Sequence, residues 1–381
     1  MRTLDAGPAV TMYVCGITPY DATHLGHAAT YVTFDVLGRA LRDSGQQVRY
    51  VQNVTDVDDP LLERARATGE DWRAVAQRET ELFRTDMTAL RVVPPEHYVG
   101  AVESIPLVLD MINRLLELGA TYVLDGDVYF AVDSAEQLGE ISHLDRATMI
   151  SLSRENGGDP DRAAKKNPLD ALLWRAERPG EPAWPSPFGP GRPGWHIECA
   201  AIAAEFLGTT IDVQGGGVDL VFPHHELSAA HVAVASSSWP FARTYVHQAM
   251  IGFEGHKMSK SRGNLVLVSA LRAAGVDPMA VRLALLAHDH RQPWEWTPAD
   301  LKRADSRLAA WRAATGRSAG PPAEATLTAV RAALAKGLDT PRALRAVDEW
   351  VADAAGSGTD RRGPALIRAL ADSLLGVDLD G

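Results

Sequence analysis

The sequence is poor in cysteine and has neither a long apolar run nor an excess of basic residues. Only two cysteines, Cys15 and Cys199, occur among its 381 residues. No apolar stretch of about 18 residues is free of charge, so no membrane-spanning helix is expected. Residues 1–8 lack the apolar core of a signal peptide. We therefore expect a cytoplasmic protein whose thiols are metal ligands, catalytic groups or core side chains rather than a disulfide.

Charge and hydrophobic content narrow the class of protein further. The formal net charge of −11 argues against a large nucleic-acid-binding surface. A hydrophobic content of 46% over this length is sufficient for two or three domains. There are no internal repeats. Composition therefore indicates a globular protein without an extended basic surface.

Short β-prone segments alternate with helical patterns, which favours an α/β fold with a parallel sheet. Strands are expected at 11–15, 47–53, 210–214 and 246–253. A helix is expected at 28–41, and a largely helical stretch at 60–90. Polar residues follow the expected strands, and parallel sheets bind ligands at the carboxyl ends of their strands.

The chain is expected to have three parts. A Rossmann-like catalytic domain is split between residues 1–91 and 194–264. Between them, residues 92–193 form a connective insertion with a helix, a hairpin and then an irregular region from 133, since six prolines between 178 and 193 exclude a single regular element. Residues 265–381 have amphipathic patterns typical of a helical C-terminal domain.

Two short motifs are suited to phosphate. His24-Leu25-Gly26-His27 places two imidazoles at an expected strand-to-helix turn, where helix N–H groups also bind anions. Lys257-Met258-Ser259-Lys260-Ser261 places two lysines on a glycine-flanked loop, suited to a polyphosphate whose charge grows in the transition state. Separately, the motifs are also consistent with surface histidines and a solvated charged loop. Their order and separation along the chain favour ATP chemistry.

With these motifs the sequence resembles a class I aminoacyl-tRNA synthetase, and more narrowly the cysteine-activating branch. The resemblance runs from about residue 11 to 264. It is carried by residues 12–18, 53–59, 193–199, 215–220 and 222–226. It implies a class I synthetase-like Rossmann sheet and an aminoacyl-adenylate intermediate.

Cys15, Cys199 and His224 supply two thiolates and an imidazole, a set that suits Zn²⁺. Their spacing alone is equally consistent with two buried thiols and a core histidine. The resemblance implies that they bind one zinc ion whose open position is filled by the thiolate of a cysteine substrate. Such a bond would select cysteine over serine without an editing domain.

Three features depart from a cysteinyl-tRNA synthetase. Ser228 replaces the glutamate that those enzymes have four residues after the liganding histidine, so a site closer to three ligands is expected. Residues 155–160 resemble the Glu-Arg-Gly-Gly-Asp-Pro signature of the mycothiol-pathway cysteine ligases, with Asn156 in place of arginine. Residues 263–381 carry 15 Lys/Arg and 14 Asp/Glu, without the basic surface that tRNA requires. The sequence is therefore identified as a member of these ligases, which join cysteine to the amine of glucosaminyl-inositol.

Matching positions imply a role for each candidate residue. The phosphate-stabilising residues would be His24, His27, Lys257 and Lys260. The residues binding cysteinyl-adenylate would be Cys15, Gly16, Ile17, Thr18, Thr30, Asn53, Val54, Thr55, Trp195, Gly217, Val218, Asp219 and Ile251. Mg²⁺ would accompany ATP. The polar turn at 155–160 would meet the hydroxyls of the sugar and inositol.

The expected partners are ATP, L-cysteine and an amino-sugar inositol acceptor, with no tRNA and no membrane, and the expected state is a monomer. The alternatives are a shortened cysteinyl-tRNA synthetase, a paralogue that passes cysteine to another small amine, and a non-catalytic zinc protein that keeps the fold. The sequence indicates no general base for the transfer step.

Overall fold

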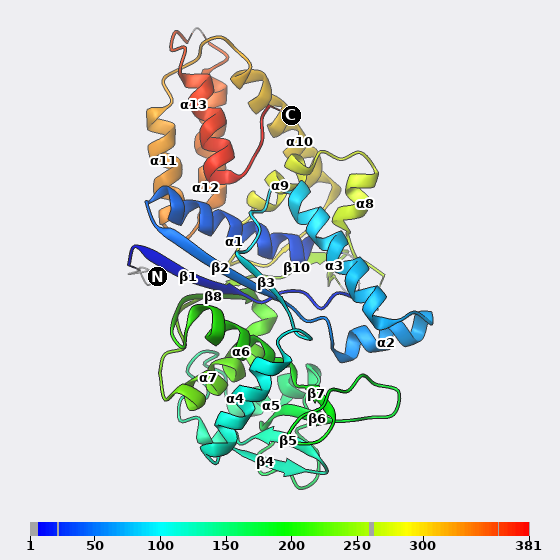
Figure 1. Cartoon of the computed structure of the whole chain (residues 1–381). Coiled ribbons are helices and arrows are strands. Elements are labelled where there is room, and N and C mark those ends of the chain that lie inside the picture. Colours follow the sequence, from blue (N-terminus) through cyan, green and yellow to red (C-terminus); the bar gives the residue numbers. More distant parts are fainter. Residues whose placement is uncertain (1–6, 21–22, 259–262, 357, 381) are drawn as a thin grey trace.

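A five-stranded parallel sheet forms the centre of the molecule (Figure 1). The computed structural model describes residues 7–20, 23–258, 263–356 and 358–380. Neighbouring strands follow the order β3-β2-β1-β8-β9, and each pair is parallel. The strands are β1 (Ala9–Val14), β2 (Gln47–Val54), β3 (His97–Gly100), β8 (Ile211–Gly217) and β9 (Ala242–Gln248). The expected α/β class with a parallel sheet is confirmed.

Side chains of β1 alternate between two apolar cores, one on each face of the sheet. Met12 and Val14 belong to the core shared with α1 (Leu25–Asp43). Tyr13 belongs to the core shared with α6 (Trp195–Leu207) and α7 (Glu226–Ser236). Figure 1 shows α1 on one side of the sheet and α6 and α7 on the other. A parallel sheet covered on both faces explains why β1, with the sequence AVTMYV, is apolar almost throughout.

The order of the strands places a crevice at the end of β1. The chain continues from β1 to β2 on one side, whereas β8 pairs with β1 on the other. Open parallel sheets bind ligands outside the carboxyl ends of the strands, at the point where the strand order changes direction. Cys15 and Thr55 directly follow β1 and β2, so both lie at this edge.

The segment between β3 and α6 forms a second, antiparallel sheet with the strand order β4-β5-β6-β7. Its elements are α4 (Ile105–Glu117), β4 (Thr121–Leu124), β5 (Asp127–Phe130), α5 (Arg146–Glu155), β6 (Ala171–Ala176) and β7 (Gly191–Pro193). Phe130 and Trp174 are fully buried in its core, which also includes residues of α6 and α7. The insertion is therefore packed against the main sheet domain.

The structure corrects two expectations about this segment. β3 lies within residues 92–193 yet pairs in parallel with β2, Val99 opposite Asn53, so the main sheet includes residues beyond 91. The region after 133, expected to be irregular, contains α5, β6 and β7. β3 has four residues, too few for a periodic signal, and β6 and β7 are stabilised by partners that are distant in sequence.

Two further expected elements are each divided in two. The expected strand at 246–253 ends as β9 at Gln248, and β10 (Ile251–Phe253) pairs instead with β11 (His256–Lys257) and β12 (Trp294–Glu295). The helical stretch at 60–90 consists of α2 (Asp59–Thr68) and α3 (Trp72–Ala89). Gly69 ends α2 in a left-handed conformation, with φ 69°.

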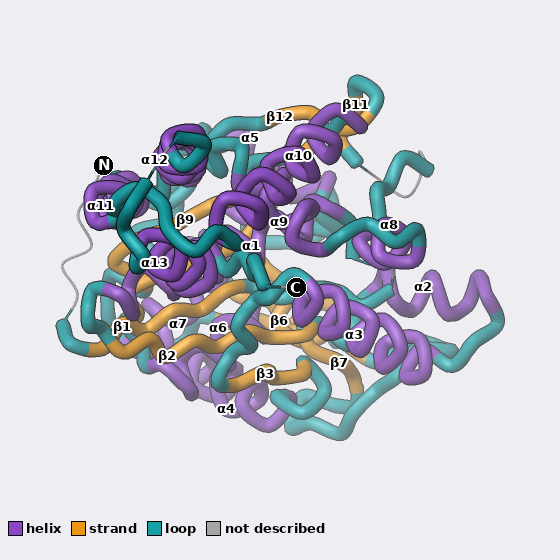
Figure 2. Tube along the Cα trace, turned by 90° about the horizontal axis from the view of Figure 1, so that it is seen from above, coloured by secondary structure: helices purple, strands orange, loops and turns teal. Residues whose placement is uncertain are grey.

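The C-terminal part is helical, as expected. Its helices are α8 (Val268–Ala273), α9 (Pro278–Leu286), α10 (Pro298–Thr315), α11 (Glu324–Ala335), α12 (Thr340–Asp353) and α13 (Gly363–Leu370). Their buried residues form one core with those of α1, and Figure 2 views the molecule from the side of these helices. Within the described ranges, no helix combines the length and the apolar character needed to cross a bilayer.

A buried ion pair joins this helical part to α1, which covers one face of the parallel sheet. Arg282 and Asp35, on α9 and α1, have side chains that are 0% exposed. The Arg282 guanidinium also donates to the carbonyls of Leu375 (2.6 Å) and Leu90 (2.7 Å). Asp35 also accepts from the backbone N–H of Val93 at 2.9 Å. Because a buried charge is costly without its partners, these bonds couple four segments that are distant in the sequence.

We expect Arg282→Met to lower the free energy of unfolding by roughly 1–3 kcal/mol, since it leaves the Leu375 and Leu90 carbonyls without their buried donor, whereas Asp35 keeps a second cation, Arg39, at 2.7 Å. Urea unfolding followed by circular dichroism measures the change. The matched control is Arg331→Met, which removes a pair between Asp43 and an arginine that is 51% exposed. It should cost less than about 1 kcal/mol. Equal losses in the two variants would contradict this account.

Candidate active site and metal cluster

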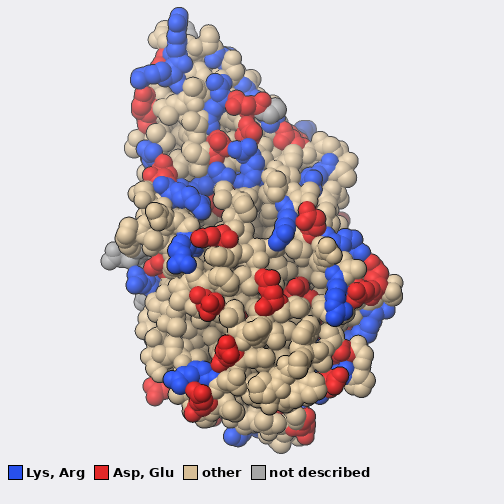
Figure 3. Space-filling model, in the orientation of Figure 1, with Lys and Arg blue, Asp and Glu red and all other residues tan. Residues whose placement is uncertain are grey.

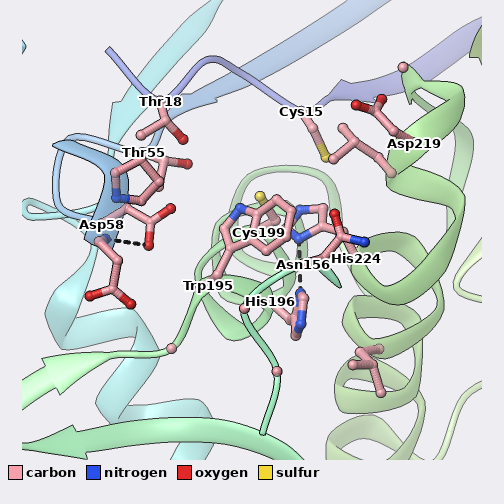
Figure 4. Close-up of a pocket in the computed structure, with 18 of the residues that line it drawn as sticks. Cys15, Thr18, Thr55, Asp58, Asn156, Trp195, His196, Cys199, Asp219 and His224 are labelled. Carbon is pink, nitrogen blue, oxygen red and sulfur yellow. Dashed lines mark hydrogen bonds between the residues drawn. The ribbon is translucent and has the colours of Figure 1, made fainter. Parts of the chain in front are cut away.

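A cavity of about 900 Å³, called the central cavity below, opens at the carboxyl ends of the parallel strands. Its lining comes from the ends of β1, β2 and β8, the start of α1, the start of α6, and the inserted sheet. Figure 4 shows a pocket with Thr18 and Cys15 along the top of the view and Trp195, Cys199 and His224 near its centre. The residues singled out from distant parts of the sequence therefore meet around one space.

Cys15, Cys199 and His224 form the metal-binding candidate among the described residues. Their ligand atoms lie within 4.8 Å of one another and all three residues are buried. Cys15 follows β1, Cys199 lies on α6, and His224 lies in the turn before α7. Burial raises the pKa of the Cys15 thiol, so a nearby cation would be needed to favour its thiolate form. Two sulfurs and one imidazole are a donor set that fits a thiophilic divalent cation.

Aromatic groups hold the His224 ring in place. Trp195 stacks on it, with ring centroids 4.4 Å apart and an interplanar angle of 25°. His196 Nδ1 lies 3.1 Å from His224 Nδ1. Burial lowers the pKa of His196 well below the usual value, so this ring is neutral at pH 7 and one of the two facing nitrogens can donate to the other. Histidines that bind metals are commonly oriented by a hydrogen bond at their second ring nitrogen.

Cys15 has its own supporting contacts. His225 Nε2 lies 3.3 Å from its sulfur, and Gln214 Nε2 donates to the sulfur at 3.4 Å. His225 Nδ1 in turn lies 2.8 Å from His247 Nε2. These partners come from β8, β9 and the turn before α7, so the position of the sulfur depends on the register of the sheet. Sequence reasoning missed them, although His225 is adjacent to His224 in the same motif.

Ser228 lies on α7 and is not part of the metal-binding group. Its hydroxyl donates to the backbone carbonyl of His196 at 3.0 Å. The group found among the described residues therefore contains three candidate ligands, Cys15, Cys199 and His224, and does not include the serine.

The loop after β1 is joined closely to the end of β2. The Asn53 side chain accepts from the Gly16 N–H at 2.7 Å, and the Thr55 N–H donates to the Ile17 carbonyl at 3.0 Å. A Cβ on Gly16 would lie 1.6 Å from the Asn53 carbonyl oxygen, so only glycine fits there. Gly16, Ile17, Thr18, Asn53 and Thr55 all line the central cavity.

The N-terminus of α1 provides an anion-binding end to the cavity. His24 caps the helix, its Nδ1 accepting from the Gly26 N–H at 3.0 Å. The His24 and His27 rings are stacked with centroids 3.8 Å apart. His24, Gly26, His27 and Thr30 line the cavity. The positive end of the α1 dipole and two imidazoles suit phosphate oxygens.

The remaining expected residues fall into three groups. Trp195, Gly217, Asp219 and Ile251 line the cavity. Val54 is buried and Val218 is 41% exposed, and neither lines it. Lys257 lies on β11 with only its backbone described, and Lys260 lies outside the described residues.

The inserted sheet and the start of α2 supply a charged wall that the sequence reasoning largely missed. Its side chains include Asp58, Asp59, Asp127, Asp159, Arg162, Arg175, Arg178 and Arg192. Only the turn containing Glu155, Asn156 and Asp159 was anticipated on this side, and all three line the cavity. The acidic run at 56–59 was the available signal for Asp58 and Asp59.

Known proteins resemble this chain in sequence and in fold. The family model described as tRNA synthetases class I (C) catalytic domain matches residues 3–306. Proteins named L-cysteine:1D-myo-inositol 2-amino-2-deoxy-alpha-D-glucopyranoside ligase are similar throughout. The one from Parafrankia sp. is 61% identical over 100% of this chain and 87% of its own length. The one from Thermomonospora curvata is 60% identical over 100% of this chain and 92% of its own length.

The solved structure of Mycobacterium tuberculosis methionyl-tRNA synthetase in complex with methionyl-adenylate shares 16% identity with this chain, with a TM-score of 0.67. The match covers 96% of this chain and 89% of that one, and it shows the class I synthetase-like fold. The chain therefore belongs to the class I (C) tRNA synthetase catalytic-domain family and, within it, to the L-cysteine:1D-myo-inositol 2-amino-2-deoxy-alpha-D-glucopyranoside ligases.

Proposed function

We propose that the chain is an ATP-dependent, AMP-forming ligase that activates L-cysteine as cysteinyl-adenylate and transfers it to the amine of glucosaminyl-inositol, a step of mycothiol biosynthesis. The cysteine carboxylate attacks the α-phosphate of ATP and releases pyrophosphate. The acceptor amine then attacks the activated carbonyl, forming an amide and releasing AMP. The observation that carries this proposal is the buried Cys15, Cys199 and His224 group, which opens onto the central cavity of a chain 60% identical to a named ligase.

Selection of cysteine follows from the chemistry of that group. Cys15, Cys199 and His224 would hold one Zn²⁺ ion. When bound, the ion supplies an open position that a substrate thiolate fills well and a serine hydroxyl fills poorly at neutral pH. Trp195 stacks on His224 and lines the cavity, so it would form a wall of the cysteine subsite.

The adenylate would lie between the cluster and the start of α1. The first turn of α1, with His24 and His27, would receive the α-phosphate. Lys257 and Lys260 would add positive charge around the phosphates, together with Mg²⁺ bound to ATP. Further contacts are proposed for Gly16, Ile17, Thr18, Thr30, Asn53, Val54, Thr55, Gly217, Val218, Asp219 and Ile251. Positioning and electrostatic stabilisation would provide most of the acceleration of the first step.

The acceptor would enter from the inserted sheet. The described lining of the cavity carries seven carboxylates and four arginines. Arg175 and Arg192 pair with Asp59, while Arg162 and Arg178 pair with Asp127. An acidic wall whose arginines are already paired favours a cationic, hydroxyl-rich molecule over a polyanion such as tRNA. The turn with Glu155, Asn156 and Asp159 would meet its hydroxyl groups.

We expect the purified chain to contain about one zinc ion per molecule, the stoichiometry of a single Cys₂His site. Elemental analysis by mass spectrometry measures this content. His224→Gln should lose most of the zinc because it removes the nitrogen ligand. His97→Gln, which changes a histidine on β3 outside the cluster, should retain it. Full activity and selectivity after removal of the metal would contradict the assignment.

We expect cysteine-dependent ATP–pyrophosphate exchange, with serine less efficient by roughly 10⁴-fold, the discrimination reached when a site binds one particular heteroatom. The ratio of kcat/KM for the two amino acids measures it. The discrimination should fall steeply in His224→Gln. Exchange with serine at a rate near that with cysteine would rule out selection by the metal.

We expect glucosaminyl-inositol, ATP and cysteine to yield the amide and AMP in a stoichiometric ratio, detected by mass spectrometry of the products. A tRNA(Cys) transcript supplied instead should not be charged, because the cavity wall is acidic. Charging of tRNA without amide formation would favour a shortened cysteinyl-tRNA synthetase.

A further inference from the structure

The transfer step requires a group that takes a proton from the attacking amine, and several cavity carboxylates are already committed to other bonds. Asp59 is paired with Arg175 and Arg192, and Asp127 with Arg162 and Arg178. Asp159 is bound by Lys165 and Tyr129. Asp170 accepts from the Tyr122 hydroxyl and from the backbone N–H groups of Val132 and Asn167. These carboxylates hold the wall of the cavity together.

Asp58 differs from them in its surroundings. It lies between β2 and α2 and lines the central cavity. Its side chain accepts one hydrogen bond, from the backbone N–H of Asp59 at 2.8 Å, which caps α2. Among the described residues no arginine, lysine or histidine forms an ion pair with it. One carboxylate oxygen therefore remains available to a ligand.

The position of Asp58 is between the cysteine subsite and the inserted sheet. Arg175 on β6 and Arg192 on β7 act on its charge from the inserted sheet. Its own charge acts on Glu198, the residue before Cys199 on α6. Figure 4 shows Asp58 on the same side of the pocket as Thr18 and Thr55, across from Trp195. A cysteinyl carbonyl held between the metal cluster and the start of α1 would face this space.

We propose that Asp58 is the general base of the transfer step. This inference rests on the proposed function. The acceptor amine attacks in its neutral form, after its ammonium has lost a proton to water. Its nitrogen forms a bond to the cysteinyl carbonyl carbon, the bond from that carbon to the AMP oxygen breaks, and the proton that the nitrogen then loses goes to the Asp58 carboxylate and then to water. AMP leaves with the bonding electron pair.

The electrostatics of the position agree with this role. Burial raises the pKa of Asp58 to about 6, and the charge of Asp59 adds to the rise, while Arg192 and Arg175 oppose it. A carboxylate with this pKa is ionised at pH 7, yet is more basic than an exposed aspartate. General bases work best with a pKa near the operating pH. The active, ionised form is lost as the pH falls through about 6.

The test measures two reactions separately in the variant Asp58→Asn: the activation of cysteine and its transfer to the acceptor. Asparagine caps helices about as well as aspartate, so α2 should be preserved. We expect ATP–pyrophosphate exchange to stay within about threefold of wild type. Transfer from preformed cysteinyl-adenylate to glucosaminyl-inositol, measured in single-turnover quench experiments at saturating acceptor, should fall by about 10²-fold or more. Asp58→Ser, which also caps a helix, should behave in the same way.

The control is Asp71→Asn, which changes the aspartate that caps α3 and does not line the cavity. It should leave both half-reactions and the unfolding midpoint unchanged. The pH profile adds a second readout, because the loss of transfer rate near pH 6 should disappear in Asp58→Asn. Hydroxylamine, a neutral nucleophile that needs less help from a base, should react with the adenylate of wild type and variant at similar rates.

Each other outcome overturns the proposal in a distinct way. A raised acceptor KM with an unchanged saturating rate would make Asp58 a binding residue. Equal losses in exchange, transfer and unfolding midpoint would make it only a helix cap. If the wild-type chain forms no cysteinyl-adenylate, the proposed function itself fails, whereas normal transfer by Asp58→Asn overturns only the role of this residue.

Discussion

The meeting of Cys15, Cys199 and His224 is the constraint on which the site depends. Each residue belongs to a different segment, at the end of β1, on α6 and before α7. Their ligand atoms reach within 4.8 Å of one another only because β1 pairs with β8 and α6 packs beneath the sheet. Gln214 on β8 contacts the Cys15 sulfur. A slip of one residue in the β1–β8 register would therefore remove this contact and separate Cys15 from the other two residues of the cluster.

Charge is distributed unevenly around the central cavity. The start of α1 and its two histidines offer an environment for phosphate, while the inserted sheet offers carboxylates whose arginine partners are already bound. This separation suits a reaction in which a phosphate leaving group and an attacking amine must both reach one carbonyl. Binding each group in its own region would supply much of the catalysis through orientation.

The C-terminal helices pack against α1 on one face of the sheet. Their core is continuous with that of α1, and the buried Arg282–Asp35 pair fastens α9 to it. On the face drawn in Figure 3, acidic and basic side chains are interspersed over these helices. The near balance of charge in residues 263–381 agrees with this picture.

Motifs and alternating patterns in the sequence determined the fold class, the helical tail and the candidate metal ligands, because these features are local or recur in a family. The short strand β3, the division of 246–253 into β9 and β10, and the order within 133–193 were decided by pairing with distant partners. The same holds for the contacts of His225, Gln214 and His196 around the cluster. Only the tertiary structure distinguished Asp58 from its neighbour Asp59, since the presence of an ion-pair partner depends on arginines more than 100 residues away in the chain.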